Sequence, residues 1–279
     1  MKGGIIVLKS NCHTHTVFCD GKNTPEEMLE AAVALSFESL GLSVHSPMPY
    51  ENSYAIGYDM VESYVSEIKR LRKKYAEKIY AANGIELDAD SLPFDTQNFD
   101  FSIGSVHQLH FENRMYSVDY TAQMLKSCAE REFSGSFQKL AEHYFSLVYS
   151  LICKAKPDIV GHFDLIEKFN ENDALFNSKS RKYRNAALEV VDGICDVSPD
   201  IIFEVNTGAM FRCGRSVPYP ARFILERLKK RGMRITVTSD AHCTEALDFG
   251  FKSAESLCRS CGFKSAYIIT QNGFAEREI

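Results

Sequence analysis

Two short motifs near opposite ends of the chain combine residue types that bind metal ions. Cys-His-Thr-His at residues 12–15 and Ser-Asp-Ala-His at residues 239–242 each place two potential ligands two positions apart. Each motif follows a run that predicts a β-strand, at residues 5–8 and 235–238. Side chains at positions i and i+2 of an extended segment point the same way, so each pair can converge on one ion. Imidazole and carboxylate ligands together suit zinc, iron or manganese.

The length and charge of the chain restrict the classes of protein to consider. A chain of 279 residues fits one large domain or two small ones, and single (β/α) barrels routinely have this length, so we expect one barrel domain spanning residues 1–279. The formal net charge of −5 gives no electrostatic footprint for long nucleic acids, so we expect none as a partner. The apolar run at residues 5–8 is too short for a signal peptide or a membrane span, so we expect a cytoplasmic protein with no membrane partner.

Short β-branched runs alternate with amphipathic stretches throughout, which is typical of βα units. Thr24, Pro25 and Glu27 predict the start of a helix. Thr24 is the capping residue, Pro25 lies in the first turn, and Glu27 is the acid that completes a capping box. The expected helices are 24–37, 59–77, 120–132, 137–155, 178–195 and 218–231, with another from about residue 244. Besides those before the two motifs, the expected strands are 39–44, 79–85, 99–106, 158–161, 201–205 and a last edge strand at 267–269.

Most of the candidate ligands share one place in this pattern, at the C-terminal end of a predicted strand. Those ends meet on one face of a barrel, where the active sites of barrel enzymes lie. His143 falls on a helix and is expected to pack or lie at the surface, whereas His110 lies in a loop where it could touch a ligand. The residues at strand ends are His13, His15, His45, Glu86, His107, His162, Asp240 and His242.

The same residues, taken in order, resemble those of the polymerase and histidinol phosphatase (PHP) family. The similarity runs from His13 to about residue 250 and includes Phe-Cys-Asp-Gly at 18–21, Gly-Ser-Val-His at 104–107 and Gly-His-Phe-Asp at 161–164. It implies a distorted seven-stranded TIM-like (β/α) barrel with two or three divalent ions, Zn²⁺, Fe²⁺ or Mn²⁺. The implied metal ligands are His13, His15, Asp20, His45, Glu86, His107, His162, Asp240 and His242.

The resemblance also implies how these ligands divide among three ions. The three sets would be His13, His15, Glu86 and Asp240; Glu86, His107 and His162; and Asp20, His45 and His242. Nine ligands are indeed too many for one ion. Glu86 would bridge two ions about 3.5–4 Å apart, and a hydroxide shared by them would be the nucleophile.

Within the family, the histidinol-phosphate phosphatases are the more similar group. Residues 19–22 leading into a Pro-Glu-Glu-Met helix, residues 41–47, and residues 204–208 with the Tyr-Pro pair at 219–220 carry this resemblance. Val44 occupies a position where an Asp is common in that group. We expect this difference to affect the properties of the bound metals more than the reaction itself. The implied activity is hydrolysis of L-histidinol phosphate to L-histidinol and phosphate, in histidine biosynthesis.

Arg212 is the first candidate for holding the phosphate, because a guanidinium in a loop after a strand end can make two bonds to it. Lys168, Arg181 and Arg184 are further candidates, and Asn206 is expected to order the site by hydrogen bonding. Asp240 and His242 are both plausible proton donors to the leaving alkoxide. Residues 109–120 are expected to form a lid. The side chains available to meet the imidazole are Tyr50, Glu51, Phe111, Glu112 and Tyr116.

Two other functions remain open from the sequence. The chain could be another PHP phosphoesterase that acts on nucleotide 3′-phosphates or short oligonucleotides, or a non-enzymatic metal-binding accessory domain of a polymerase. The complete ligand set argues against the accessory domain. The identity of the ions and the oligomeric state are not decided by the sequence. The nine cysteines predict no disulfide framework; Cys12, Cys19, Cys213 and Cys243 are expected to fill the walls of the site, and Cys258 and Cys261 to be helix-end thiols.

Overall fold

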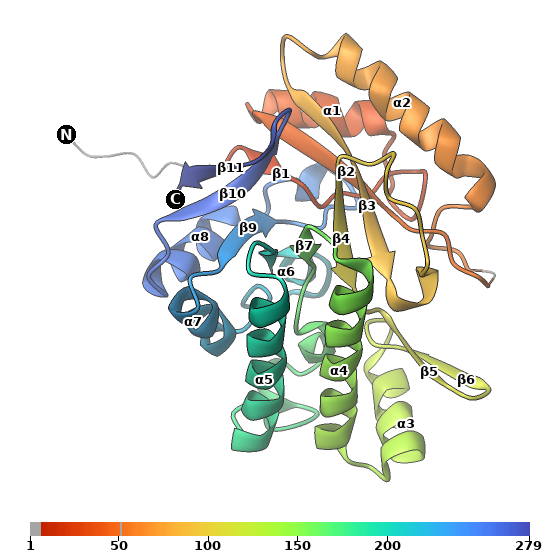
Figure 1. Cartoon of the computed structure of the whole chain (residues 1–279), viewed down its shortest axis with the longest axis vertical. Coiled ribbons are helices and arrows are strands. Elements are labelled where there is room, and N and C mark those ends of the chain that lie inside the picture. The colour runs from red at the N-terminus through yellow and green to blue at the C-terminus, as the bar shows by residue number, and fades with distance from the viewer. Residues whose placement is uncertain (1–6, 51) are drawn as a thin grey trace.

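A seven-stranded parallel sheet in the order β1-β2-β3-β4-β7-β8-β9 organises the chain (Figure 1). The computed structural model describes residues 7–50 and 52–279. The segments after β1 and β9 pair through a parallel bridge between Thr14 and Ala241, so the sheet is a nearly closed barrel. The strands are β1 (Ser10–Asn11), β2 (Ser39–His45), β3 (Tyr80–Asp88), β4 (Phe101–Ser105), β7 (Ile159–Val160), β8 (Ile202–Asn206) and β9 (Arg234–Thr238).

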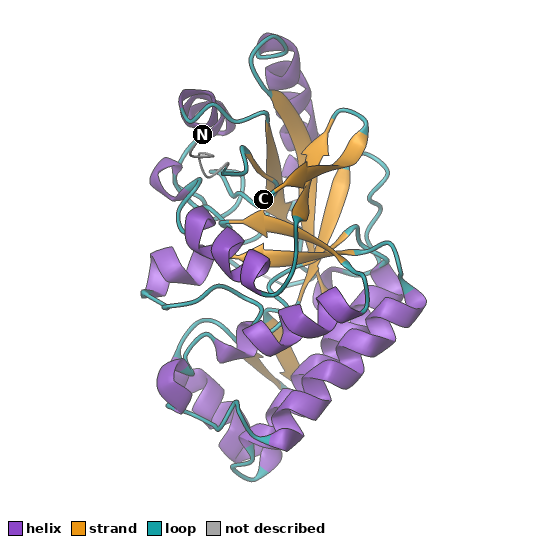
Figure 2. Cartoon of the chain, turned by 90° about the vertical axis from the view of Figure 1, so that its left-hand side faces the viewer, coloured by secondary structure: helices purple, strands orange, loops and turns teal. Residues whose placement is uncertain are grey.

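Helices lie around the outside of these strands (Figure 2). Thr24 and Glu27 form the capping box that the sequence predicts at the start of α1. Among the described residues, no helix is long and apolar enough to cross a membrane. The α-helices are α1 (Pro25–Ala34), α2 (Val61–Lys74), α3 (Ala122–Phe133), α4 (Phe137–Ala155), α5 (Arg181–Val197), α6 (Gly208–Cys213), α7 (Arg222–Lys230) and α8 (Phe251–Ser260).

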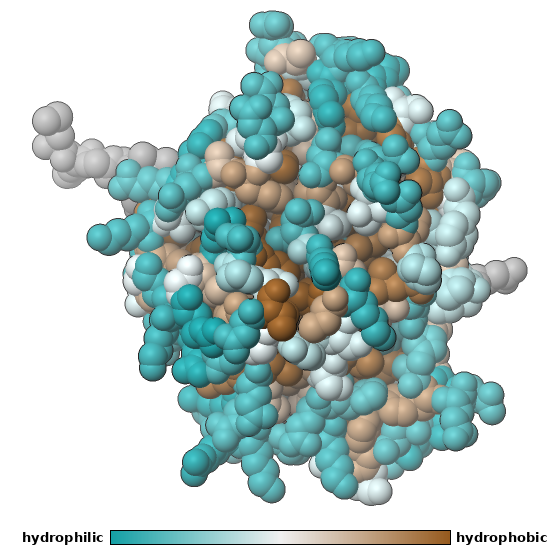
Figure 3. All heavy atoms as spheres, viewed as in Figure 1, coloured by the Kyte–Doolittle hydropathy of each residue, from teal (hydrophilic) through white to brown (hydrophobic). Residues whose placement is uncertain are grey.

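An apolar cluster fills the barrel interior away from the candidate ligands. The ring of Phe101 occupies the space beside Gly41 and Gly84, where any side chain would collide with it. The face shown in Figure 3 is hydrophilic around its edge, with hydrophobic side chains gathered toward its middle, near β4 and β7. The buried cluster consists of Cys12, Ala82, Phe101, Ile103, Ile159, Ile202 and Ile269. The candidate ligands lie at the other end of the strands.

Several predicted elements differ from those observed. Of the strand expected at residues 5–8, residues 5 and 6 lie outside the described residues, and the first strand is Ser10–Asn11. The helix expected from residue 218 begins at Arg222, because Tyr219 pairs with Asn206 in an isolated bridge. The helix expected at 59–77 begins with the 3-10 turn η1 (Tyr58–Met60) and ends at Lys74.

Two hairpins were not predicted. The expected edge strand at 267–269 is instead part of β10 (Ser265–Thr270), which pairs with β11 (Gly273–Glu278) in a separate sheet. Its turn is closed by Gly273 at φ +89°, and Ile269 is buried in the apolar cluster. The segment expected as a lid contains β5 (Gln108–Phe111) and β6 (Arg114–Ser117), also an antiparallel pair.

Candidate metal centre

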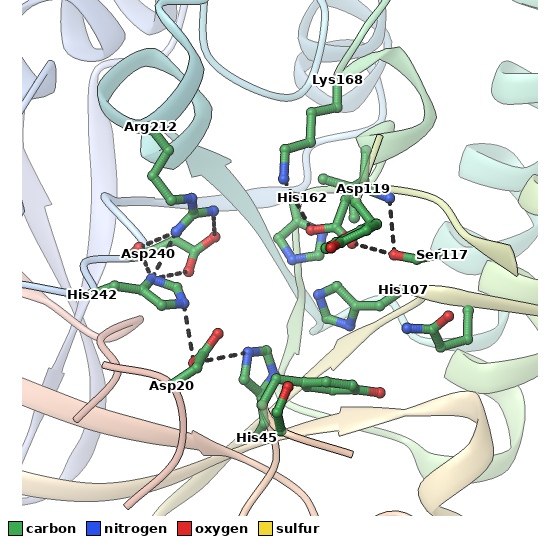
Figure 4. A pocket seen from close by; sticks show the side chains of 15 residues that line it. Asp20, His45, His107, Ser117, Asp119, His162, Lys168, Arg212, Asp240 and His242 are labelled. Carbon is green, nitrogen blue, oxygen red and sulfur yellow. Dashed lines mark hydrogen bonds and ion pairs between the residues drawn. The ribbon is translucent and has the colours of Figure 1, made fainter. Parts of the chain in front are cut away.

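The nine predicted ligands lie together at the C-terminal ends of the barrel strands. His45 ends β2 and Glu86 lies within β3, while Asp20 lies in the loop before α1. The remaining six follow β1, β4, β7 and β9. All nine are buried except Asp20, whose side chain is 33 % exposed, and His242, whose side chain is 19 % exposed. In Figure 4, the labelled members Asp20, His45, His107, His162, Asp240 and His242 point toward one cavity.

The Glu86 carboxylate lies between two pairs of histidines. Its Oε2 atom is 3.3 Å from Nε2 of His13 and 3.5 Å from Nε2 of His15. Its Oε1 atom is 3.1 Å from Nε2 of His162 and 3.6 Å from Nε2 of His107. Nδ1 of His45 lies closer still to Oε2, at 2.9 Å. The two carboxylate oxygens thus face different sets of imidazole nitrogens, which is the arrangement that a bridging ligand requires.

A second carboxylate, Asp240, faces the first of these pairs. Its Oδ1 atom is 3.2 Å from Nε2 of His15 and 3.6 Å from Nε2 of His13. This residue lies two positions after the end of β9 and has φ +47°, in the left-handed region that non-glycine residues seldom adopt. Strained backbone of this kind clusters at functional sites, where the surrounding structure holds it.

Asp20 belongs to a more exposed group of ligands. Its Oδ1 atom is 3.3 Å from Nε2 of His242, 3.6 Å from Nε2 of His45 and 3.9 Å from Nδ1 of His15. The ring of His15 stacks on the rings of His45 and His242, with centroids 4.3 Å away in both cases. His15 therefore lies at the junction of the first and third predicted sets.

The electrostatics of the cluster keep its carboxylates ionised but divide its histidines. Burial acts to lower the pKa of His13, His45 and His107, but the surrounding carboxylates raise all three, that of His107 to about 10. Burial, followed by the neighbouring imidazoles of His242 and His45, lowers the pKa of His15 to about 3, so this ring is neutral at pH 7. Burial acts to raise the pKa of Glu86, but the surrounding histidines, His13 first, hold it well below its ordinary value. Neutral imidazole and ionised carboxylate are the protonation states that metal binding requires.

Buried polar atoms at the centre of the cluster fit bound cations. Nε2 of His13, Nε2 of His15 and Oε2 of Glu86 are buried and make no hydrogen bond in the described part of the chain, although Nδ1 of His45 lies 2.9 Å from the carboxylate oxygen. Most buried polar atoms in proteins are paired. These three are donor atoms preferred by zinc, iron and manganese, and they lie within 4.8 Å of one another. The residues present therefore fit divalent ions.

Two further carboxylates, which the sequence analysis did not assign to the site, orient the ligands from behind. Oε1 of Glu204 lies 2.5 Å from Nδ1 of His13, and its Oε2 accepts the backbone N–H of His162 at 2.6 Å. Oδ2 of Asp88 accepts the backbone N–H of His107 at 3.0 Å and lies 2.9 Å from its Nδ1. Such partners fix the orientation and tautomer of metal-binding histidines. The sequence signal that could have identified Asp88 was its spacing, because it lies two residues after Glu86 on the same strand.

Arg212 lies on the short helix α6 and not in the loop that was predicted. Its Nη2 donates to Oδ2 of Asp240 at 2.7 Å, and its Nη1 donates to the Asp240 backbone oxygen at 2.7 Å. Nη1 is also 2.7 Å from Nδ1 of His242. The side chain is 29 % exposed and lines the cavity (Figure 4), so it can reach both the ligand cluster and a bound anion.

The other predicted substrate-binding residues have different surroundings. Lys168 lines the cavity, and its Nζ donates to Oδ2 of Asp119 at 3.0 Å. Asn206 is buried and donates to Oε2 of Glu204 at 3.0 Å. Arg181 is exposed at the start of α5 and does not line the cavity, and Arg184 lies over the ring of Phe223.

A cavity of about 420 Å³ opens onto the ligands and is large enough for a small phosphate ester. Four of the five side chains predicted to meet an imidazole are described by the structure, and these four do not line it. Tyr50 donates to Asp90, the hydroxyl of Tyr116 donates to Glu132, and neither Phe111 nor Glu112 borders the space; Glu51 lies outside the described residues. The cavity wall beyond the ligands is formed by Ser53, Tyr54, Gln108, Ser117, Asp119, Tyr120, Leu165, Lys168 and Arg212.

The two histidines left out of the predicted ligand set lie away from the ligands. His110 pairs with Asp90, and its Nε2 lies 2.5 Å from Oδ2 of that residue. The ring of His143 lies between those of Phe111 and Phe133.

All nine cysteines are free. Cys12 and Cys243 are buried wall residues, and Sγ of Cys19 is 3.4 Å from Nδ1 of His15. Cys213 is exposed and is not the wall residue that was expected.

Comparison with known proteins gives consistent matches over most of the chain. The family model of the PHP domain matches residues 11–208. A Schizosaccharomyces pombe protein named "Probable histidinol-phosphatase" is 25 % identical over 94 % of this chain and 89 % of its own length. The histidinol-phosphatase of Bacillus subtilis is 28 % identical over 87 % of this chain and 96 % of its own.

A solved structure shares the fold. It is the histidinol phosphate phosphatase of Lactococcus lactis, in complex with zinc, L-histidinol and phosphate. The two structures superpose with a TM-score of 0.71 over 95 % of this chain and 98 % of the Lactococcus lactis chain, and their sequences are 18 % identical. The predicted TIM-like α/β architecture is thereby confirmed.

Proposed function

The chain belongs to the PHP domain family, and we propose that it is a metal-dependent phosphomonoesterase that hydrolyses L-histidinol phosphate to L-histidinol and phosphate. The observation that carries the reaction class is the Glu86 carboxylate, which lies between two pairs of histidines at the base of an open cavity. Two observations support this choice of substrate. Relatives named histidinol-phosphatase match over nearly their full length, and a solved structure of similar fold contains L-histidinol and phosphate. Histidine biosynthesis is the corresponding pathway.

The nine clustered ligands would hold two or three divalent ions, of zinc, iron or manganese. Mixed imidazole and carboxylate ligation suits all three metals, and zinc is bound in the Lactococcus lactis structure. When bound, such ions supply positive charge that stabilises phosphoryl oxygens and lowers the pKa of water. We retain the division into three sets that the resemblance implies; His15, which also lies beside Asp20, and His45, which also lies beside Glu86, could each serve two sets.

Residues around the cluster would hold the substrate. Arg212 is fixed by Asp240, which leaves its guanidinium on the cavity wall, where it would bind a phosphoryl oxygen through a charge-assisted hydrogen bond. Lys168 is a second cation on this wall. Asp240 and His242 both line the cavity beside Arg212, and we propose that one of them gives the proton to the leaving alkoxide.

Phosphate release by metal-loaded protein tests this function. The panel is histidinol phosphate, nucleoside 3′- and 5′-phosphates, and a simple alkyl phosphate of similar size. We expect a kcat/KM for histidinol phosphate at least about tenfold above that for the alkyl phosphate, since one well-placed hydrogen bond or ion pair contributes roughly that much. A preference for a nucleotide would instead indicate another PHP phosphoesterase. Release from none of the substrates would indicate a non-enzymatic domain.

A further inference from the structure

Selection of one phosphomonoester depends on the cavity wall beyond the ligands, because the phosphate and the metal ions are common to all of these substrates. L-histidinol phosphate carries an ammonium group on the carbon next to the one that bears the ester oxygen. A primary amine is protonated at pH 7, and a cation that leaves water needs an anionic partner. A wall that selects this substrate therefore needs a carboxylate close to the groups that hold the phosphate.

Asp119 is the only carboxylate on this wall, among the described residues, that lies outside the predicted ligand set. The other two that line the cavity, Asp20 and Asp240, face ligand histidines. The Asp119 side chain is 29 % exposed, and Figure 4 shows it beside Lys168, across the cavity from Arg212. The side chain is therefore accessible to a molecule bound in the cavity.

Lys168 and Ser117 hold the Asp119 carboxylate and leave part of it free. Oδ2 accepts from Nζ of Lys168 at 3.0 Å, and Oδ1 accepts from Oγ of Ser117 at 2.9 Å. A carboxylate has about four acceptor positions, so these two bonds leave room for a further donor. Burial acts to raise the pKa of Asp119, but Lys168 and then His107 lower it to about 2, so the group is ionised at pH 7.

Both members of this ion pair are fixed against the ligand cluster. The side chain of Val118 is buried, and its backbone N–H donates to the backbone oxygen of His107 at 2.8 Å. Lys168 directly follows the 3-10 turn η3 (Leu165–Glu167), which comes just after the ligand His162. If Lys168 binds a phosphoryl oxygen, as the proposed function has it, Asp119 lies one contact away from the phosphate. The substrate places its ammonium at a similar remove, since only two carbon atoms separate this group from the ester oxygen.

We propose that the Asp119 carboxylate accepts a hydrogen bond from the ammonium group of the substrate, which makes Asp119 a specificity-determining residue; this inference rests on the proposed function. Phosphate, Lys168, Asp119 and ammonium then form a series of alternating charges. A simple alkyl phosphate offers no donor to the carboxylate. Sites built to hydrogen-bond a substrate N–H discriminate against analogues that lack it.

The test compares Asp119→Asn with the wild type on histidinol phosphate and on 3-(imidazol-4-yl)propyl phosphate, which lacks only the ammonium group. Asp192→Asn is the matched control, because that side chain is 25 % exposed and pairs with Arg227 away from the cavity. We expect Asp119→Asn to lower kcat/KM for histidinol phosphate by at least about tenfold more than for the analogue, mostly through KM, since a hydrogen bond between charged groups contributes that much. Metal content measured by elemental analysis should match that of the wild type.

The substrate change is a second test that needs no variant. Removal of the ammonium from the substrate should lower kcat/KM of the wild type by at least about tenfold, and should cost Asp119→Asn much less. Equal kcat/KM of the wild type for the two substrates would overturn the inference.

The remaining outcomes separate this inference from the proposed function. Equal losses on both substrates in Asp119→Asn would overturn the inference and leave Asp119 as a residue that only positions Lys168. A response no larger than that of Asp192→Asn would also overturn it. In each of these cases the proposed function stands, provided that the wild type still prefers histidinol phosphate to a nucleotide and to the simple alkyl phosphate. Loss of that preference in the wild type would overturn the proposed function itself, and the inference with it.

Discussion

Nδ1 of His13 lies 2.5 Å from Oε1 of Glu204, and neither side chain is exposed to solvent. This contact turns the opposite ring nitrogen, Nε2, toward Glu86 and Asp240. Glu204 also accepts from the backbone N–H of His162 at 2.6 Å and from the hydroxyl of Thr238 at 2.6 Å. One buried carboxylate therefore orients candidate ligands that follow β1 and β7.

Replacing this carboxylate should weaken metal binding. We expect Glu204→Gln to lower metal affinity by about 10–100-fold, the usual effect of removing the group that orients a metal-binding histidine. The measurement is metal content after dialysis against graded chelator concentrations. Thr238→Val, which removes one donor to Glu204 but keeps the carboxylate, should have a smaller effect. Unchanged affinity in Glu204→Gln would mean that the position of His13 is set by packing.

Glu86→Gln should abolish most activity and loosen at least one metal ion. The change removes the negative charge that faces both histidine pairs, so more than one ion should be affected. Elemental analysis and steady-state kinetics give the readouts. Glu255→Gln is the matched control, because Glu255 is a fully buried carboxylate that accepts the backbone N–H of Leu8, away from the site. Full metal occupancy with near-normal turnover in Glu86→Gln would contradict the trinuclear assignment.

Arg212→Ala should raise KM and lower kcat/KM for a phosphomonoester by about tenfold or more. The physical ground is the loss of a charge-assisted hydrogen bond, which contributes roughly 1.5–3 kcal/mol. Metal content should be largely retained, because Asp240 also faces His13 and His15. Arg184→Ala serves as the control, since that guanidinium lies over Phe223 and not on the cavity wall. If kcat/KM is unchanged in Arg212→Ala, the phosphate is held elsewhere, and Lys168 is the next residue to test.

The buried carboxyl of Glu167 should make stability fall as the pH rises. Burial, and then the nearby Asp164, raises the pKa of Glu167 from 4.5 to about 7. The folded protein therefore keeps a proton that the unfolded chain releases, so this contribution is complete below about pH 4.5 and is lost as the pH rises through about 7. Thermal unfolding is the measurement. Glu167→Gln should raise Tm relative to the wild type at pH 8 and much less at pH 5. An equal difference in Tm at both pH values would show that Glu167 titrates normally.

Local rules were sufficient for most of the helices and barrel strands and for the proximity of the ligands, but not for the two hairpins. The two-residue spacing in 12–15 and 239–242 places both side chains of each pair on one side, and the βα alternation brings strand ends to one face. The capping box at Thr24 and the helix at Phe137–Ala155 depend on neighbours within a few residues, and both agree with the sequence expectation. Residue chemistry and periodicity are properties of the sequence, so the barrel and the ligand cluster were open to prediction.

The groups around the cluster were decided by the tertiary structure. Glu204 lies 191 residues from His13 along the chain, and nothing local predicts that they touch. The lid segment illustrates the same point, since the sequence indicated Phe111 and Tyr116 as wall residues, yet the pairing of β5 with β6 leaves Gln108 and Ser117 on the cavity. Side chains alternate sides along a strand, so the register and tilt of a short hairpin decide which of them reach the ligand. That register depends on packing against α3 and the rest of the fold, because the free energy that selects it comes from contacts between distant segments.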